Sequence, residues 1–267
     1  MKWTTFLGAI LAVLAPSVMA GPLNDAVEAR LLPGWRAADG RHMAAVEVTL
    51  AKGWKTYWRA PGDAGIPPRF DWRGSDNLAG VEITWPTPDV MLQDGMQVIG
   101  YSGRLILPLA ILPKQQGRDV QLSGSIDIGV CKDVCLPINV SLDQVLQSDV
   151  TKPTPSIAAA MADRPYSSRE AKVGRVRCQI SPTSEGLQLT AEVDLPQIGG
   201  AEVAVIETDN PQIWVAQGKT SRNGKRLTTV SELIHVEGRA FALNRSGLRI
   251  TVIGASHAVD IQGCPAG

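Results

Sequence analysis

The chain has 267 residues, with 26 basic and 26 acidic side chains that give a formal net charge of zero. This balance lacks the basic surface typical of nucleic-acid-binding proteins, and it does not favour a partner found through long-range electrostatic attraction. Domains usually contain about 100–200 residues, so the length allows one large domain or two small ones.

The first twenty residues have the features of a secretory signal peptide. Lys2 gives a positive start, an apolar stretch runs from Phe6 to Leu14, and a small-residue cleavage site ends at Ala20. The apolar stretch is shorter than the roughly 20 residues that cross a bilayer. We therefore expect residues 1–20 to be removed, leaving an exported protein, most simply in a bacterial periplasm, without membrane insertion.

Alternation of apolar and polar residues predicts a protein built from β-strands. Residues 42–50 and 187–195 alternate with a period of two, the pattern of a strand buried on one face. The 26 glycines and 18 prolines divide the chain into short segments, as a β-sandwich requires. We expect an all-β protein with two sandwich domains at residues 21–150 and 170–267. The linker at 151–169 is rich in Pro, Ser and Thr and holds one predicted short helix at 156–162.

Four cysteines in an exported chain most often form disulfides, and three pairings are formally possible. The short spacing favours a bond between Cys131 and Cys135, which leaves Cys178 with Cys264. The second bridge would enclose 85 residues. In the chain-entropy model such a bridge stabilises the fold by roughly 4–5 kcal/mol, so we expect it to be structural.

The sequence around Cys131 and Cys135 predicts a β-hairpin. Most even positions from 120 to 130, and all those from 134 to 140, are apolar and would face the core. Both cysteines have the opposite parity, so we expect both sulfurs on the outer face, about 5.5 Å apart between Cα atoms. A disulfide outside the core is open to attack by a thiolate. An inert hairpin staple is the alternative interpretation.

An aromatic segment precedes this hairpin. Six aromatic residues lie between positions 54 and 85, and the segment 53–72 passes through a loop rich in Pro and Gly. A sandwich core with a tight corner is the simpler interpretation for Trp54, Phe70 and Trp72. The loop at 61–68 is a candidate lid over the sulfur pair.

Segment 53–72 and the run Gly129–Pro137 resemble the periplasmic amino-terminal domain of the DsbD family of transmembrane thiol:disulfide reductases. The ScsB-type branch, associated with copper tolerance, is the most similar. The resemblance covers about residues 40–145 and implies that the sandwiches are immunoglobulin-like. It also implies a redox pair that takes electrons from a membrane-embedded thiol reductase and passes them to thioredoxin-like periplasmic proteins.

The resemblance assigns the redox pair to Cys131 and Cys135, and it implies a cap region at 61–68 together with two aromatic residues. The candidate surround of the pair is Tyr57, Trp58, Pro61, Gly62, Asp63, Lys132 and Asp133. Lys132 would favour a thiolate and Asp133 would oppose it. Better-known members place five residues between their cysteines, whereas this chain has three. The membrane and thioredoxin-like domains have no counterpart in this sequence, so we expect a stand-alone protein with a separate electron donor.

Two other functions remain open. Thiolates and thioethers select Cu(I), so both cysteines could bind copper, with Met91, Met96, His42 and Met43 as conceivable further ligands. A pure interaction protein with two inert disulfides is the second alternative. Four well-spaced zinc ligands are not visible, and no nucleophile elbow or phosphate-binding glycine loop is present. We expect no cofactor and no resident metal.

Overall fold

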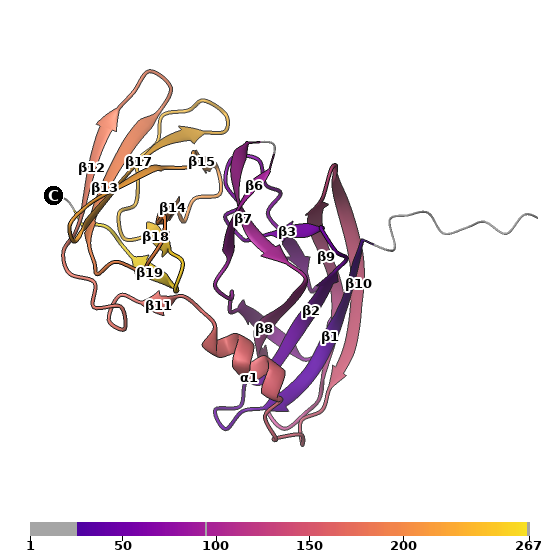
Figure 1. The fold of residues 1–267 in the computed structure, drawn as a ribbon. Helices are drawn as coiled ribbons and strands as arrows, with labels where there is room; N and C mark the ends of the chain where they lie inside the picture. Colours follow the sequence, from indigo (N-terminus) through magenta and orange to yellow (C-terminus); the bar gives the residue numbers. More distant parts are fainter. Residues whose placement is uncertain (1–25, 94, 266–267) are drawn as a thin grey trace, which may run out of the picture.

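The computed structural model describes residues 26–93 and 95–265, and nearly all of its regular structure is β (Figure 1). The expected signal peptide at residues 1–20 lies outside the described residues. Within the described ranges, the structure contains no helix with the length and apolar character needed to cross a bilayer. The strands form four sheets, two on each side of α1 (Pro155–Ala162) in the sequence.

The first half is a sandwich of two sheets. One sheet contains, in spatial order, β1 (Val27–Arg36), β2 (His42–Leu50), β8 (Arg104–Pro113) and β5 (Leu78–Ile83). The other contains β10 (Cys135–Leu146), β9 (Val120–Cys131), β3 (Lys55–Tyr57), β7 (Met96–Ser102) and β6 (Asp89–Gln93), and β4 (Arg69–Asp71) also pairs with β9. Apolar side chains of both sheets, such as Leu107 and Leu122, meet in the main core.

The second half repeats this architecture. One sheet contains β11 (Tyr166–Ser167), β19 (Ala258–Gln262), β18 (Arg249–Ile253) and β14 (Val203–Glu207). The other contains β12 (Val176–Pro182), β13 (Leu187–Asp194), β17 (Arg226–His235) and β15 (Ile213–Val215), and β16 (Lys219–Asn223) also pairs with β17. Leu189, Ala191 and Val193 of β13 are buried in a separate core, on the one face that the alternation at 187–195 predicts.

The helix α1 covers the outer face of the first sheet. It begins with Pro155, whose fixed φ suits the first helical position. Ile157 is fully buried and packs in a cluster with Trp35, Met43, Ala45 and Ala110. The predicted strand at 42–50 is found as β2 with those bounds, but it is buried on both faces. The alternation of residues 42–50 predicts one buried face. It carries no information about α1, which covers the other face.

A buried carboxylate lies on that covered face of β2. The side chain of Glu47 is 4% exposed, and it accepts hydrogen bonds from Arg30 Nε and Arg104 Nε, both at 2.6 Å. Burial would raise the pKa of Glu47, but the hydrogen bonds from Arg104 and Arg30 outweigh burial and hold this pKa below its usual value. The carboxylate is therefore ionised and paired at neutral pH.

The two sandwiches lie next to each other (Figure 1). They contact each other through polar and apolar groups. Arg59 donates from Nε and Nη2 to the two carboxylate oxygens of Glu207, both at 2.9 Å. The backbone amide of Gln217 donates to Asp63 Oδ1 at 2.8 Å. Apolar side chains of the second half also belong to the main core cluster, namely Val203, Val205, Ile253 and Ala258.

A disulfide between Cys178 and Cys264 joins the two sheets of the second half, with 5.6 Å between the Cα atoms. Cys178 lies in β12, and Cys264 follows β19, which belongs to the other sheet. Both cysteines are buried, so the bridge fixes the sandwich from within.

Replacing Cys178 and Cys264 by Ala together should lower the free energy of unfolding by roughly 4–5 kcal/mol, because the unfolded chain would regain the entropy of a long loop. Urea denaturation followed by tryptophan fluorescence measures this loss.

The matched control is the double replacement of Cys131 and Cys135 by Ala, which frees a loop of only three intervening residues. The same model gives a loss of about 2 kcal/mol for that pair. Equal losses for the two double variants would contradict a mainly structural role for the long-range bridge.

Candidate redox site

The hairpin of β9 and β10 carries the first disulfide at its end. Cys131 and Cys135 are partners in the strand register and are bonded to each other, with Cα atoms 4.2 Å apart. This separation is shorter than the expected 5.5 Å and is close to the roughly 4.5 Å of a cross-strand pair without mutual backbone hydrogen bonds. The connection is closed by a hydrogen bond of 3.2 Å from the Lys132 amide to the Val134 carbonyl oxygen.

The two faces of β9 lie in different surroundings. The even-numbered side chains are buried in the main core, namely Val120, Leu122, Ile126, Ile128 and Val130. Cys131 has the opposite parity and lies outside that core, in a small separate cluster. This outer cluster consists of Tyr57, Val98 and Cys131, with Ala64 and Met91 packed against them.

The two cysteines differ in exposure. Cys131 is 0% exposed, whereas Cys135 is an exposed residue. We expected both sulfurs to be open on the outer face, but the outer cluster covers Cys131. Val134, which we expected on the apolar face of the hairpin, is 62% exposed because it lies in the connection beyond the sheet. An incoming thiol can therefore reach Cys135 more directly than Cys131.

Two polar side chains contact the sulfurs. The Tyr57 hydroxyl lies 2.8 Å from Cys131 Sγ, 3.4 Å from Cys135 Sγ and 2.9 Å from Gln93 Oε1. The Gln93 side-chain amide donates to Cys135 Sγ at 2.9 Å. A phenol hydroxyl carries one hydrogen and can direct it to either partner. The arrangement places a hydrogen-bond donor beside each sulfur of the pair.

Strand register and a glycine bring Tyr57 to this position. In β3, Lys55 is the register partner of Cys131, so Lys55 and Tyr57 share its outer face. A Cβ atom added to Gly129 would lie 2.7 Å from Ile66 Cβ and 3.1 Å from Tyr57 Cδ2. Any larger residue at position 129 would therefore displace both side chains. Tyr57 and Ile66 can pack on the outer face of β9 only because Gly129 has no side chain.

The loop at 61–68 lies against the same face. Ala64 packs in the outer cluster, and Ile66 lies over Gly129. A Cβ atom on Gly65 would lie 2.2 Å from Pro61 Cβ and 2.9 Å from Tyr57 Cδ1, so the loop turns tightly around the Tyr57 ring. The Pro61 carbonyl accepts a hydrogen bond of 3.0 Å from the Ile99 amide, which fixes the start of the loop on β7.

The remaining candidate residues lie in three different surroundings. Trp58 is fully buried in the main core, where the Arg59 guanidinium lies 4.0 Å from its ring centroid. Asp63 faces the second sandwich and accepts the Gln217 amide. Gly62 lies between the sandwiches, because a Cβ on it would lie 3.0 Å from the Gln97 carbonyl oxygen and 3.6 Å from Gln217 Oε1. Lys132 and Asp133 are exposed in the hairpin connection.

Gln93 is the site residue that sequence reasoning missed. It lies at the end of β6, and β3 and β7 separate β6 from β9 within the sheet. No motif or spacing near the cysteines indicates it, because only the strand order brings it to Cys135. Lys55 Nζ donates to the Leu92 carbonyl oxygen at 3.3 Å and links the same end of β6 to β3.

The four conceivable copper ligands lie in different places. Met91 packs in the outer cluster with Cys131, and Met96 is exposed at the start of β7. His42 and Met43 lie on β2 in the other sheet. The His42 Nε2 atom lies 2.5 Å from the Pro33 carbonyl oxygen, and Met43 packs under α1. Across residues 26–93 and 95–265, no group of three or more His, Cys, Asp or Glu side chains is arranged to hold a metal ion.

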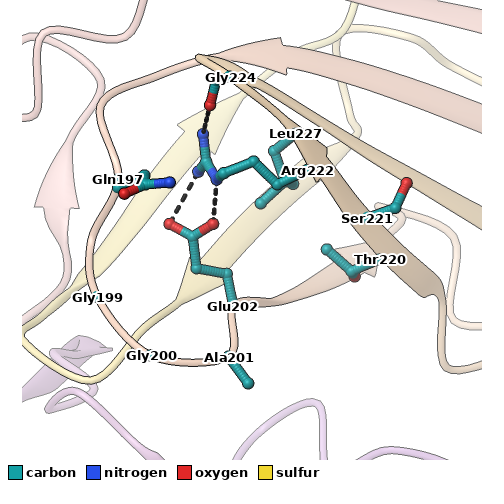
Figure 2. Close-up of a pocket in the computed structure, with 10 residues that line it drawn as sticks. All are labelled: Gln197, Gly199, Gly200, Ala201, Glu202, Thr220, Ser221, Arg222, Gly224 and Leu227. Carbon is teal, nitrogen blue, oxygen red and sulfur yellow. Dashed lines mark hydrogen bonds and ion pairs between the residues drawn. The ribbon is translucent and has the colours of Figure 1, made fainter.

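A hollow of about 440 Å³ in the second sandwich carries no comparable chemistry (Figure 2). Arg222 forms an ion pair there with Glu202 and donates to the Leu195 and Gly224 carbonyl oxygens. Glu202 also accepts the Ile198 amide at 2.9 Å. The charged groups of this hollow already have partners within the chain, which favours a structural role.

Comparisons with known proteins find one matching family model and a similar solved structure. The family model of the N-terminal domain of thiol:disulfide interchange protein DsbD matches residues 28–147. Among solved structures, the N-terminal periplasmic domain of ScsB from Proteus mirabilis has the same fold, with a TM-score of 0.70 and 21% identity over 93% of this chain and 97% of that chain. No curated protein sequence matches the chain significantly.

The ScsB domain matches both sandwiches of this chain and supports the all-β, immunoglobulin-like architecture. The family match spans the first sandwich, including β3, the loop at 61–68 and the β9–β10 hairpin. The first sandwich of this chain, through residues 28–147, therefore matches the family of DsbD N-terminal domains.

Proposed function

We propose that the chain exchanges thiols and disulfides with other proteins through the Cys131–Cys135 pair. The observation that carries this proposal is the unequal cover of the two residues: Cys135 is exposed at a hairpin end, and Cys131 is buried behind it. A purely structural bridge needs no accessible sulfur, as the fully buried Cys178–Cys264 pair illustrates. The match of residues 28–147 to a thiol:disulfide interchange family supports the same conclusion.

In the reducing direction, the Cys135 thiolate attacks one sulfur of a partner disulfide and forms a mixed disulfide, while the partner's other sulfur leaves as a thiolate. The Cys131 thiolate then attacks Cys135 Sγ, forms the intramolecular bond and releases the partner's second thiolate. Two electrons pass to the partner, and the chain ends with the Cys131–Cys135 disulfide. The reverse reaction runs through the same mixed disulfide at Cys135.

Tyr57 stabilises the charge that this exchange creates on Cys131. Its hydroxyl lies 2.8 Å from Cys131 Sγ, in a cluster from which water is excluded. A hydrogen bond to a charged group contributes about 1.5–3 kcal/mol, more than one to a neutral group. Gln93 is placed to do the same for Cys135 at 2.9 Å.

The family suggests the place of this exchange in an electron relay. We propose that a membrane-embedded thiol reductase donates electrons to the pair and that thioredoxin-like periplasmic proteins accept them. The similar ScsB domain is described as periplasmic, which supports a periplasmic location for this chain. The second sandwich contacts Arg59, which precedes the loop at 61–68, and Asp63 within that loop, and it serves as a scaffold in this proposal.

Single-cysteine variants test which cysteine attacks a partner disulfide. With Cys131→Ala, the remaining Cys135 thiol should react with 5,5′-dithiobis(2-nitrobenzoate) at least about tenfold faster than the Cys131 thiol left by Cys135→Ala, because access controls exchange. Release of thionitrobenzoate measures both rates.

Both variants should react at similar rates in guanidinium chloride, where the outer cluster no longer covers Cys131. A folded Cys135→Ala variant that reacts as fast as Cys131→Ala would contradict the assignment of Cys135 as the attacking sulfur.

Replacing Tyr57 by Phe keeps the ring and removes the hydroxyl. Reduction of the Cys131–Cys135 bond by glutathione should slow roughly 10- to 100-fold, since the leaving Cys131 thiolate loses a hydrogen bond worth about 1.5–3 kcal/mol. Stopped-flow tryptophan fluorescence can follow this reaction.

The matched control is Tyr166→Phe, because Tyr166 is exposed in the second sandwich and should leave the rate unchanged. Rates of Tyr57→Phe within twofold of the unaltered protein would show that the hydroxyl does not assist the leaving thiolate.

A further inference from the structure

A groove runs along the outer face of the β9–β10 hairpin, next to the disulfide. Its volume is about 330 Å³, and it is lined by Ile66, Pro67, Arg69, Asp127, Ile128, Pro137, Ile138 and Asn139. Pro137 and Asn139 follow Cys135 on the outer face of β10, two and four positions further along the strand. The groove therefore begins about 7 Å from the exposed cysteine, at a rise of roughly 3.4 Å per residue.

The cap loop forms the opposite wall of this groove. Ile66 lies over Gly129, which is the register partner of Pro137. The same Ile66 is 38% exposed, so part of its side chain remains open to solvent. At the far end, Arg69 of β4 is the register partner of Asp127, and Asn139 donates to Asp127 Oδ1 at 2.6 Å. The walls near the sulfur are apolar, and the polar groups lie at the end away from it.

We propose that this groove binds the stretch of polypeptide that flanks the reactive cysteine of the exchange partner. The proposal rests on the proposed function, and it adds where the partner chain lies and which side chains it carries there. A mixed disulfide holds the partner's sulfur about 2.05 Å from Cys135 Sγ, so the residues beside the partner's cysteine must lie on the surface that adjoins Cys135. An extended chain covers roughly 3.3 Å per residue, so about two to four residues from that cysteine reach the groove.

The lining selects apolar flanking residues. Ile66, Pro67 and Pro137 offer no side-chain donor or acceptor, and Pro137 also lacks a backbone N–H. A polar side chain placed between Ile66 and Pro137 would lose water without gaining a hydrogen bond there. Burial of an apolar side chain at the same point is favourable, at about 25 cal/mol per Å² of apolar surface.

Two synthetic peptides test this inference, each with one cysteine held as a mixed disulfide with thionitrobenzoate. One peptide carries Val and Leu on both sides of the cysteine, and the other carries Ser and Gly. The Cys131→Ala protein attacks the peptide sulfur with its Cys135 thiolate, forms a protein–peptide disulfide and expels thionitrobenzoate, which absorbs visible light. We expect the apolar peptide to react at least fivefold faster than the polar peptide.

Two groove variants, made in the Cys131→Ala background, should abolish this preference. Ile66→Ser removes the apolar wall, and Asn139→Trp fills the groove from the other side without touching Cys135. We expect the ratio of the two rates to fall below twofold in both. Ser141→Trp is the matched control, because Ser141 lies on the same face of β10 two positions beyond Asn139 and does not line the groove. It should keep the preference.

The reaction with oxidised glutathione separates this proposal from the proposed function. All groove variants should react with oxidised glutathione at the rate of the Cys131→Ala parent, because Cys135 itself is unchanged. Equal rates for the two peptides with the parent, or a preference that survives in both groove variants, would overturn the groove assignment. If the Cys135 thiol reacts with neither of the two peptides nor with oxidised glutathione, the proposed function itself is overturned.

Discussion

The cross-strand pairing of Cys131 with Cys135 is the constraint on which the rest of the site depends. Side chains alternate along paired strands, so this register puts both sulfurs on the outer face while the even-numbered neighbours fill the main core. A shift of one residue in either strand would separate the sulfurs and expose the apolar face. The same register places Gly129 opposite Pro137, and thereby sets where Tyr57 and the cap loop can lie.

The unequal exposure of the two cysteines distinguishes this disulfide from the second one. Cys178 and Cys264 are both buried and join two sheets, so their bond closes a long loop and is shielded from attack. At the hairpin, Cys135 is open while Cys131 lies beneath Tyr57 and the loop at 61–68. The start of that loop is in turn held by the second sandwich, through the hydrogen bond between Asp63 and Gln217.

Features set by local alternation could be predicted from the sequence, whereas features set by distant strands could not. The period-two patterns predict β2, β13 and the hairpin. The short helix predicted at 156–162 is found at Pro155–Ala162. The burial of Cys131 was missed because Val98 and Met91 reach it from β7 and β6. Gln93 was missed for the same reason. The position of Trp58 beside Tyr57 in the sequence predicts a cap residue, because it does not tell which face Trp58 occupies. The structure places Trp58 in the main core.

Site-resolved redox titration in glutathione buffers tests the central claim most directly, with alkylation of each cysteine quantified by mass spectrometry. We expect the Cys131–Cys135 pair to be half reduced at a potential between roughly −180 and −270 mV, the range of thiol-exchange proteins. The Cys178–Cys264 pair should stay oxidised throughout, as expected of structural disulfides with potentials below about −300 mV. If Cys131 and Cys135 stay bonded across the same range, the pair does not exchange electrons and the hairpin disulfide is structural.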